Sequence, residues 1–427
     1  MTNSLDAIAA ELQGYDPKSL PANTVNAFLE RLVVPVQVTE SVGVFDALGR
    51  VLASDVISPI SVPPHDNSAM DGFALRGEAL NPTGPTVLRL AGTAYAGAAW
   101  QGKVGAGECL KIMTGAVMPV GLDTVVPVEF VKVNEDAITV PHGVVHTGDN
   151  RRLLGEDLMQ GQPALRRGDR LGPAALGLIA SLGLPSVDVF RRLRVAYFST
   201  GDEILSLGEA PREGAVYDSN RYTVFGLLTR MGVEVLDMGV IKDDPASLEA
   251  AFRQAAATAD AIITSGGVSM GEADHTKAMM KQLGDVAFWR IAMRPGRPMA
   301  VGRIDQDGKS ALLFGLPGNP VAVMVTFLAF VRPALLQMMG VTHREPLLLK
   351  ARSAENLRKK PGRTEYQRGV VSATSDGQLQ VRTTGNQGSG VLRSMVEANG
   401  LIVLHHHQAD VAPGDEVDVM MFEGVVS

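Results

Sequence analysis

A glycine-rich segment with a nearby acid is the part of the sequence best suited to chemistry on a phosphate. It runs from Ser265 to Asp274 as Ser-Gly-Gly-Val-Ser-Met-Gly-Glu-Ala-Asp, between a strand-like run and a helix-like stretch. Glycines such as Gly266, Gly267 and Gly271 let the backbone approach a phosphate, and successive N–H groups form an anion-binding nest. Open α/β sheets bind ligands at the carboxyl ends of their strands. We therefore predict a phosphate site here, although an ordinary glycine-rich turn has the same composition.

Asp274 at the end of this segment favours a divalent cation. A carboxylate 4 Å from a phosphate charge is repelled by about 4 kcal/mol at an effective dielectric of about 20. A cation between the two groups removes that repulsion, and proteins usually hold Mg²⁺ by one or two carboxylates plus substrate phosphates. The segment is not a Walker A loop, because no Gly-Lys-Ser/Thr follows it.

Two more strand-like runs end in acids. The run that ends near Thr200 is followed by Glu203, and the next is followed by Asp243 and Asp244. Asp244 precedes Pro245, an arrangement typical of a helix N-cap. Three strand ends of one sheet thus each deliver an acid to the same edge. We predict that Glu203, Asp243 and Asp274 hold Mg²⁺ or orient water.

Arginines supply the opposite charge. Arg290, Arg294 and Arg297 fall within eight positions of an otherwise acidic protein, around a Pro-Gly pair. Arginine forks match oxyanions, so an anion clamp is one interpretation and a solvated charged hairpin is the other. Leu316–Pro320 then opens a long helix, whose N-terminal N–H groups are a further candidate anion site.

Composition excludes several classes of function. The 427 residues carry 39 Lys plus Arg against 46 Asp plus Glu, a net charge of −7, and aromatic residues make up 5%. Such a chain is a poor non-specific binder of nucleic acid or anionic membranes. The single cysteine, Cys109, cannot form an internal disulfide, and the eight histidines suggest no nucleophile–base set. His405–His407 would alternate between the two faces of a strand, so we do not expect a metal tract there.

The N-terminal residues and the longest apolar run both favour a cytoplasmic protein. The first 14 residues contain Asp6 and Glu11 and lack the basic start of a signal peptide. The apolar run lies in Val321–Val331 and is shorter than the roughly 20 residues that span a bilayer, so we expect a buried helix. Pro333 predicts a kink or break in that helix.

The elements that must position these residues change character along the chain. A helix over 24–34 and a helix over 173–181 flank a β-rich stretch, and strands alternate with helices over 193–340, which predicts a parallel sheet with helices on both faces. Short strands return near the C-terminus. The fold class is α/β plus β, in several domains. The predicted domains are 20–192 with a β-rich subdomain at about 47–148, an α/β domain at 193–340, and a C-terminal β-barrel at 345–424.

Ten sequence blocks, in order across roughly Leu20–Phe422, together resemble the MoeA family of molybdopterin molybdenumtransferases, which includes the E domain of gephyrin. The blocks are PPHDNSAMDGFAL, IMTGAVMP, RRLLGEDL, FSTGDEI, YDSNRYTV, TSGGVSMGEADHTK, RPGRPMAVG, GLPGNPVAVMVTF, PGRTEYQRG and TTGNQGSG. The resemblance implies a homodimer whose central α/β domain binds molybdopterin. It also implies insertion of molybdate into adenylylated molybdopterin, with release of AMP and a need for a divalent cation such as Mg²⁺.

The resemblance also implies site residues. The positions that match the important acids are Asp71, Asp157, Glu203, Asp243 and Asp274. The positions that match molybdate or anion contacts are Arg294, Arg297, Pro298, Arg368 and Ser389. The positions assigned to the substrate phosphate or nucleotide are Ser265, Gly266, Gly267, Gly271, Thr114, Pro317 and Pro320.

One departure and two alternatives accompany the resemblance. Many members have Lys where this chain has Arg290, Arg294 and Arg297, so a rigid fork replaces a point donor while the charge is kept. A non-catalytic molybdopterin carrier or scaffold could use the same fold, but anion binding gains nothing from five carboxylates. A molybdopterin adenylyltransferase would share the glycine-rich domain, but it lacks the other domains. Other proteins of molybdenum cofactor biosynthesis are possible partners.

Overall fold

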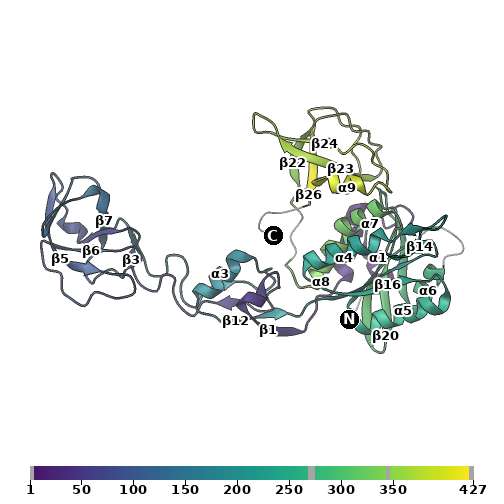
Figure 1. The fold of residues 1–427 in the computed structure, drawn as a ribbon, viewed down its shortest axis with the longest axis horizontal. Coiled ribbons are helices and arrows are strands. Elements are labelled where there is room, and N and C mark those ends of the chain that lie inside the picture. Colours follow the sequence, from purple (N-terminus) through teal and green to yellow (C-terminus); the bar gives the residue numbers. More distant parts are fainter. Residues whose placement is uncertain (1–3, 268–274, 343–346, 423–427) are drawn as a thin grey trace. The chain divides into compact units, whose positions relative to one another are not determined.

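The chain forms two compact units in the computed structural model, which describes residues 4–267, 275–342 and 347–422. Unit 1 consists of Met1–Ala53, Arg167–Ala174 and Ser186–Ser427, and unit 2 of Ser54–Arg166 and Ala175–Pro185. Figure 1 labels their helices and strands. The domain limits predicted from the sequence stay predictions.

A six-stranded mixed sheet is the centre of unit 1. Its order is β16-β13-β17-β21-β20-β18. The strands are β13 (Arg194–Thr200), β16 (Glu234–Ile241), β17 (Ala261–Ser265), β18 (Gly284–Arg290), β20 (Pro298–Gln306) and β21 (Lys309–Leu316). The four strands predicted from the sequence, β13, β16, β17 and β21, are parallel as expected. The hairpin of β18 and β20 adds two antiparallel strands that the sequence did not reveal.

Helices cover both faces of this sheet, as predicted. They are α4 (Ser219–Met231) and α7 (Pro320–Thr326) on one face, and α5 (Pro245–Thr258) and α6 (His275–Leu283) on the other. Successive strand residues point to opposite faces. Ile263 therefore joins the buried cluster that contains Leu228 of α4, whereas Ile262 joins the one that contains Phe252 of α5.

Two of these helices begin at aspartate caps. The Asp218 Oδ1 accepts a hydrogen bond from the Arg221 N–H at 3.0 Å, and the Asp244 Oδ1 accepts one from the Ser247 N–H at 3.0 Å. The bond from Ser247 also holds the pKa of the Asp244 carboxyl below its usual value. Asp244 is thus the N-cap that its position before Pro245 predicted.

The helix that follows β21 is interrupted, as Pro333 predicted. The α7 helix runs into a π-helical turn (Phe327–Val331) and then into α8 (Arg332–Met338). Pro333 has no N–H to donate, and a wider turn before it accommodates that loss. Among the described residues, Pro320–Met338 is the one stretch long and apolar enough to cross a membrane, but 67% of its apolar window is buried in unit 1. A buried core helix explains this composition.

A closed five-stranded barrel forms the C-terminal part of unit 1. The order β23-β24-β22-β26-β25 returns from β25 to β23. The strands are β22 (Leu349–Ser353), β23 (Thr364–Ala373), β24 (Leu379–Thr383), β25 (Gly400–Leu404) and β26 (Glu416–Met421), with α9 (Arg393–Glu397) beside them. Apolar residues such as Val381, Ile402 and Val419 fill its core. The predicted C-terminal barrel is confirmed.

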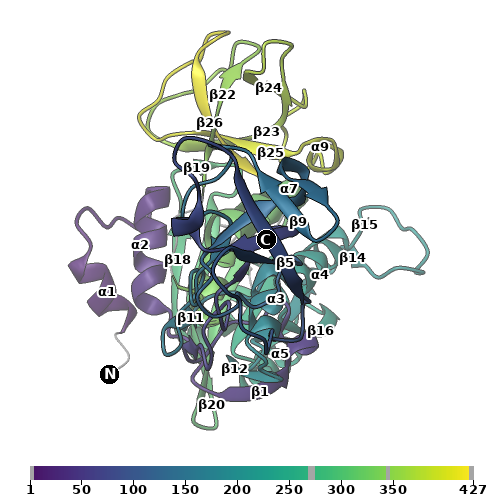
Figure 2. The same ribbon diagram turned by 90° about the vertical axis from the view of Figure 1, so that its left-hand side faces the viewer.

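The N-terminal elements of unit 1 pack against the edge of the mixed sheet. Helices α1 (Leu5–Glu11) and α2 (Ala22–Leu32), purple in Figure 2, lie beside β18. The Phe28 ring meets the Trp289 ring edge to face at 4.9 Å. The other elements of unit 1 are β1 (Thr39–Gly43), η1 (Val44–Ala47), β12 (Ser186–Phe190), β14 (Ile204–Leu205), β15 (Val216–Tyr217) and β19 (Met293–Arg294).

Unit 2 is the β-rich part that the sequence predicted. Its main sheet has the order β7-β4-β6-β5-β9-β8. The strands are β4 (Gly72–Leu75), β5 (Thr86–Ala94), β6 (Glu108–Ile112), β7 (Thr124–Pro127), β8 (Lys132–Asn134) and β9 (Ala137–Val140). The remaining elements are β2 (Val56–Ile57), β3 (Asn67–Ser68), η2 (Gly77–Ala79), η3 (Val128–Phe130), β10 (Arg151–Arg152), β11 (Pro163–Leu165) and α3 (Pro173–Ser181), of which the first two residues belong to unit 1. Burial raises the pKa of the Cys109 thiol to about 12, so this cysteine is an inert core residue.

Candidate functional site

The carboxyl ends of the parallel strands carry the glycine-rich turn of unit 1. Gly266 and Gly267 follow β17 with φ of 91° and 64°. The Gly266 N–H donates to the Leu316 carbonyl at 3.2 Å, which ties this turn to the end of β21. A Cβ at Gly266 would lie 2.4 Å from the Thr200 carbonyl oxygen, and a Cβ at Gly267 would lie 2.4 Å from the Thr276 Cβ. Both positions therefore require glycine.

Buried hydroxyls support the turn on the α4 face of the sheet. The Tyr197 hydroxyl lies 2.7 Å from the Ser265 Oγ and 2.9 Å from the Ser199 Oγ. Burial raises the pKa of Tyr197, so this hydroxyl stays neutral and can donate. Ser265 is itself buried, and its hydroxyl supports the turn through this contact with Tyr197.

A second polar chain lies on the opposite face of the sheet and leads to Asp243. The Thr276 hydroxyl lies 3.4 Å from the Thr200 hydroxyl and donates to the Asp243 Oδ1 at 3.3 Å. Asp243 is half-buried, and the same Thr276 lies against Gly267. The structure thus brings one predicted acid to the glycine-rich turn.

The other predicted acids of unit 1 lie differently. Glu203 is exposed, and its carboxylate folds back over Gly201, where a Cβ would meet the Glu203 Oε2 at 2.6 Å. Asp274 and Gly271 lie outside the described residues. Within residues 4–267, 275–342 and 347–422, no group of three His, Cys, Asp or Glu side chains is arranged to hold a metal ion. Glu203 and Asp243 alone therefore do not make the predicted metal site.

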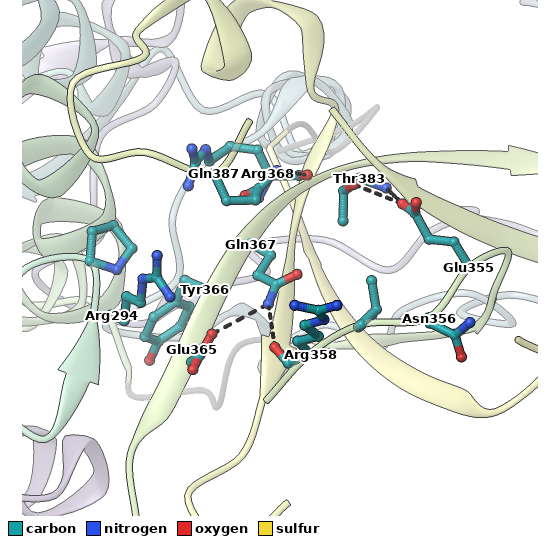
Figure 3. Close-up of a pocket in the computed structure, with 12 residues that line it drawn as sticks. Arg294, Glu355, Asn356, Arg358, Glu365, Tyr366, Gln367, Arg368, Thr383 and Gln387 are labelled. Atoms are coloured by element: carbon teal, nitrogen blue, oxygen red, sulfur yellow. Dashed lines mark hydrogen bonds between the residues drawn. The ribbon is translucent and has the colours of Figure 1, made fainter. Parts of the chain in front are cut away.

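A cavity of about 230 Å³ brings two of the predicted arginines together. Arg294 and Arg368 both line it, together with Glu355, Arg358, Glu365 and Gln387 (Figure 3). The two arginines line one cavity because β19 pairs in parallel with β23 of the barrel, so that Arg294 lies opposite Glu365 on the strand that also carries Arg368. Arg294 thus belongs to a two-residue strand through which the arginine-rich segment 290–297 contacts the barrel.

The charges in this cavity favour an anion. Arg368 is only 1% exposed, and burial, followed by the charge of Arg294, lowers its pKa to about 10, so it remains charged at neutral pH. Among the described residues, neither Arg294 nor Arg368 forms an ion pair with a carboxylate. Arg294 is exposed, but for the buried Arg368 this is unusual, because most buried charges in proteins are paired. The acids of the cavity have other partners: Glu365 pairs with Arg363 at 2.7 Å, and Glu355 accepts from the Thr383 N–H at 2.6 Å.

The remaining predicted anion residues lie around the same region but do not line the cavity. The Ser389 carbonyl accepts a hydrogen bond from the Val321 N–H at 3.1 Å, at the start of α7, which Pro320 opens. The Arg297 carbonyl accepts from the Ile291 N–H at 2.7 Å, and Pro298 begins β20 opposite Arg290. Pro317 is buried in the turn after β21.

Unit 2 brings Asp71 and Thr114 together. The Asp71 Oδ1 accepts hydrogen bonds from the Thr114 N–H at 2.6 Å and from the Thr114 hydroxyl at 2.7 Å. These bonds, led by the backbone one, hold the pKa of the Asp71 carboxyl below its usual value, so it is charged at neutral pH. Asp157 is exposed on a loop, where its N–H donates to the Val62 carbonyl at 3.0 Å.

Comparison with known families accounts for nearly the whole chain. Residues 21–183 match the MoeA N-terminal region (domain I and II), residues 196–337 match a "probable molybdopterin binding domain", and residues 350–422 match the MoeA C-terminal region (domain IV). A molybdopterin molybdenumtransferase of Haemophilus influenzae is 40% identical over 92% of this chain and 96% of its own length. The chain belongs to the MoeA family.

Further relatives agree with this assignment. A molybdopterin molybdenumtransferase of Nostoc sp. is 34% identical over 96% of this chain and 95% of its own length. The crystal structure of a molybdopterin biosynthesis MoeA protein from Pyrococcus horikoshii is 31% identical, with a TM-score of 0.71, and covers 95% of this chain and 100% of that one. The resemblance predicted from ten sequence blocks is confirmed.

The sequence did not single out several residues that line this cavity. Arg358, Gln387 and Tyr366 line the cavity, but only the last two lie in blocks that the resemblance had marked. Arg358 lies on the loop after β22, and neither spacing nor composition distinguishes it from other surface arginines. Its position is known only from the structure, where it lines the cavity and its carbonyl accepts a hydrogen bond from the Gln367 Nε2 at 3.5 Å.

Proposed function

We propose that this protein is a molybdopterin molybdenumtransferase of molybdenum cofactor biosynthesis, which inserts molybdate into adenylylated molybdopterin and releases AMP. Membership of the MoeA family supports the class of enzyme. The single observation that carries the chemistry is the cavity that both Arg294 and Arg368 line, because neither arginine pairs with a carboxylate among the described residues. Molybdate is a tetrahedral dianion, and an arginine pair suits such a group.

The arginines offset the electrostatic repulsion between the two negatively charged substrates of this reaction. One substrate carries phosphates and the other is an oxyanion, so each close pair of like charges costs about 4 kcal/mol at 4 Å and an effective dielectric of about 20. Arg294 and Arg368 offset that repulsion by holding molybdate. In this proposal the two anions bind at separate places: the arginines hold molybdate, and the Gly266–Gly267 turn holds the phosphates of the pterin substrate.

Asp243 is the described acid best placed to act on the phosphate linkage. It is half-buried, it is held by Thr276, and it lies near the glycine-rich turn. Cleavage of a phosphate linkage depends mainly on positioning and on charge neutralisation. Asp243 would orient the attacking water, and Glu203, Asp71 and Asp157 are proposed to complete the acid set.

A requirement for Mg²⁺ is a further part of the proposal, and it rests on the resemblance. Glu203 and Asp243 offer carboxylate oxygens, which Mg²⁺ prefers, although the described acids do not form a complete site. EDTA should stop AMP release, and added Mg²⁺ should restore it.

One assay separates this function from its two alternatives. Purified protein is incubated with adenylylated molybdopterin, Mg²⁺ and molybdate, and AMP is followed. Release of AMP that depends on molybdate supports the transferase. Retention of the adenylylated ligand without release would indicate a carrier. In a parallel incubation with unmodified molybdopterin and ATP, consumption of ATP would indicate an adenylyltransferase.

The glycine-rich turn gives a first testable prediction. Gly266→Ala should weaken binding of adenylylated molybdopterin at least about tenfold. The new Cβ would meet the Thr200 carbonyl in a backbone of φ 91°, and strain of about 1–3 kcal/mol is expected at such a position. Gly226→Ala on α4 is the control, because a Cβ there meets nothing within 4 Å. Equal affinities of the two variants would remove the turn from the phosphate site.

A homodimer and a cytoplasmic location complete the proposal, and both come from the sequence. The dimer predicts that mixing Asp71→Ala chains with Asp243→Ala chains restores part of the activity, since each site would draw on two subunits. Sedimentation equilibrium at micromolar concentration should show a dimer. A monomer at that concentration, together with no recovery on mixing, would contradict this part of the proposal.

A further inference from the structure

Arg368 is held in one orientation by the segment that follows β24. Its Nε donates to the Ser394 Oγ at 2.9 Å, and its Nη2 donates to the carbonyls of Asn386 at 3.2 Å and Gly388 at 2.9 Å. At 1% exposure the side chain has almost no water to replace these partners. The three acceptors therefore fix the plane of the guanidinium group.

The main chain of Arg368 is fixed as well. The Gln387 side chain accepts from the Arg368 N–H at 2.8 Å and donates to the Arg368 carbonyl at 3.2 Å. The Gly388 N–H in turn donates to the Asn386 Oδ1 at 2.9 Å, which stiffens the segment that supplies the carbonyls. Backbone and guanidinium are thus positioned by one short stretch of chain.

Ser394 is the only side chain among the described residues that accepts from the Arg368 guanidinium. It is 2% exposed on α9, and its hydroxyl donates to the Val391 carbonyl at 2.6 Å. A hydroxyl has one proton to donate and two lone pairs. Because the hydroxyl proton is donated to the Val391 carbonyl, the Ser394 Oγ can only accept the hydrogen bond from the Arg368 Nε–H.

This arrangement leaves one edge of the guanidinium for a ligand. The Nε–H and the two Nη2 bonds are directed at the protein, whereas Nη1 makes no hydrogen bond to any described residue, and Arg368 lines the cavity shared with Arg294. We propose that Ser394 is a positioning residue, which orients Arg368 so that Nη1 donates to the tetrahedral oxyanion in this cavity. The identity of that anion as molybdate rests on the proposed function.

The test is a double-mutant cycle on molybdate binding by the full chain. Equilibrium dialysis measures the molybdate Kd of the wild type, Ser394→Ala, Arg368→Lys and the double variant. A charge-assisted hydrogen bond contributes about tenfold or more to an equilibrium constant. We expect Ser394→Ala to raise the Kd about tenfold in the wild type and less than twofold in Arg368→Lys, which has no Nε to orient.

Two readouts separate positioning from a general loss of structure. Ser394→Ala should leave unchanged both kcat at saturating molybdate and the affinity for adenylylated molybdopterin. Ser58→Ala is the matched control: Ser58 is 1% exposed, and its hydroxyl also donates to a backbone carbonyl, that of Ile60 at 2.6 Å. It should lower thermal stability about as much as Ser394→Ala without changing the molybdate Kd. If Ser394→Ala does not fold, the near-isosteric Ser394→Cys takes its place in the cycle, with the same expectation of a smaller loss in Arg368→Lys.

The outcomes distinguish this inference from the proposed function. A Ser394 variant with the wild-type Kd, or with the same loss in both Arg368 backgrounds, overturns the positioning role while the transferase proposal stands. Wild-type protein that binds molybdate but releases no AMP overturns the transferase proposal, whereas the cycle still decides the role of Ser394.

Discussion

Asp243→Asn should reduce AMP release at least about 100-fold while the protein stays folded. The amide is isosteric with the carboxylate and still accepts the hydrogen bond from Thr276, so only the charge and the basicity are lost. Groups that move or orient a proton typically contribute about 10²–10⁴-fold to a rate. Single-turnover AMP release at saturating adenylylated molybdopterin and molybdate measures the effect directly.

The neighbouring aspartate is the control for that experiment. Asp244 caps α5 by accepting the Ser247 N–H, and asparagine caps helices about as well as aspartate. Asp244→Asn should therefore keep near-normal turnover. Equal losses in the two variants would show that the charge of this loop, rather than Asp243 itself, matters. Near-normal turnover of Asp243→Asn would remove Asp243 from the mechanism.

Arg294→Ala should raise the molybdate concentration for half-saturation about tenfold to a hundredfold and barely change the affinity for adenylylated molybdopterin. Arg294 lines the cavity with Arg368, and a hydrogen bond from a charged group contributes about 1.5–3 kcal/mol. Arg294→Lys should lose much less, because the charge remains. Initial rates of AMP release over a molybdate titration provide the half-saturation point.

A surface arginine of the barrel is the control for Arg294. The Arg393 side chain is 88% exposed and pairs with Glu397 four residues later on α9, a pair of small energetic weight. Arg393→Ala should leave the molybdate titration unchanged. If Arg294→Ala instead weakens binding of the adenylylated pterin and leaves the molybdate half-saturation point in place, the arginine cavity holds a phosphate, and the proposed division of the two anions is wrong.

Local rules predicted much of this architecture. Alternation of strand-like and helix-like runs predicted β13, β16, β17 and β21 as parallel neighbours, because helical crossovers between strands produce that order. Asp244 before Pro245 predicted a helix start, and Pro333 predicted the interruption that the structure shows as a π-helical turn. Each of these features depends on residues close together in the sequence.

Features that depend on distant pairing could not be predicted in the same way. The strands β18 and β20 are a different case, because β20 pairs with β21 across the short turn Asp307–Gly308, and an Asp-Gly pair is a local hairpin signal that the sequence analysis did not use. The contact of Arg294 with the barrel depends on two residues of β19 that pair with β23. The burial of Arg368 likewise follows from its partners at 386–394, and no local pattern marks Ser394 as one of them.

The central claim is that molybdenum enters the pterin as AMP leaves, and the most direct test measures both products of one reaction. Purified protein is given adenylylated molybdopterin, Mg²⁺ and a limiting series of molybdate concentrations, and pterin-bound molybdenum is quantified by mass spectrometry beside the AMP released. We predict equal amounts of the two at every molybdate concentration, and neither product without molybdate. AMP released in the absence of molybdate, or without molybdenum on the pterin, would contradict the account.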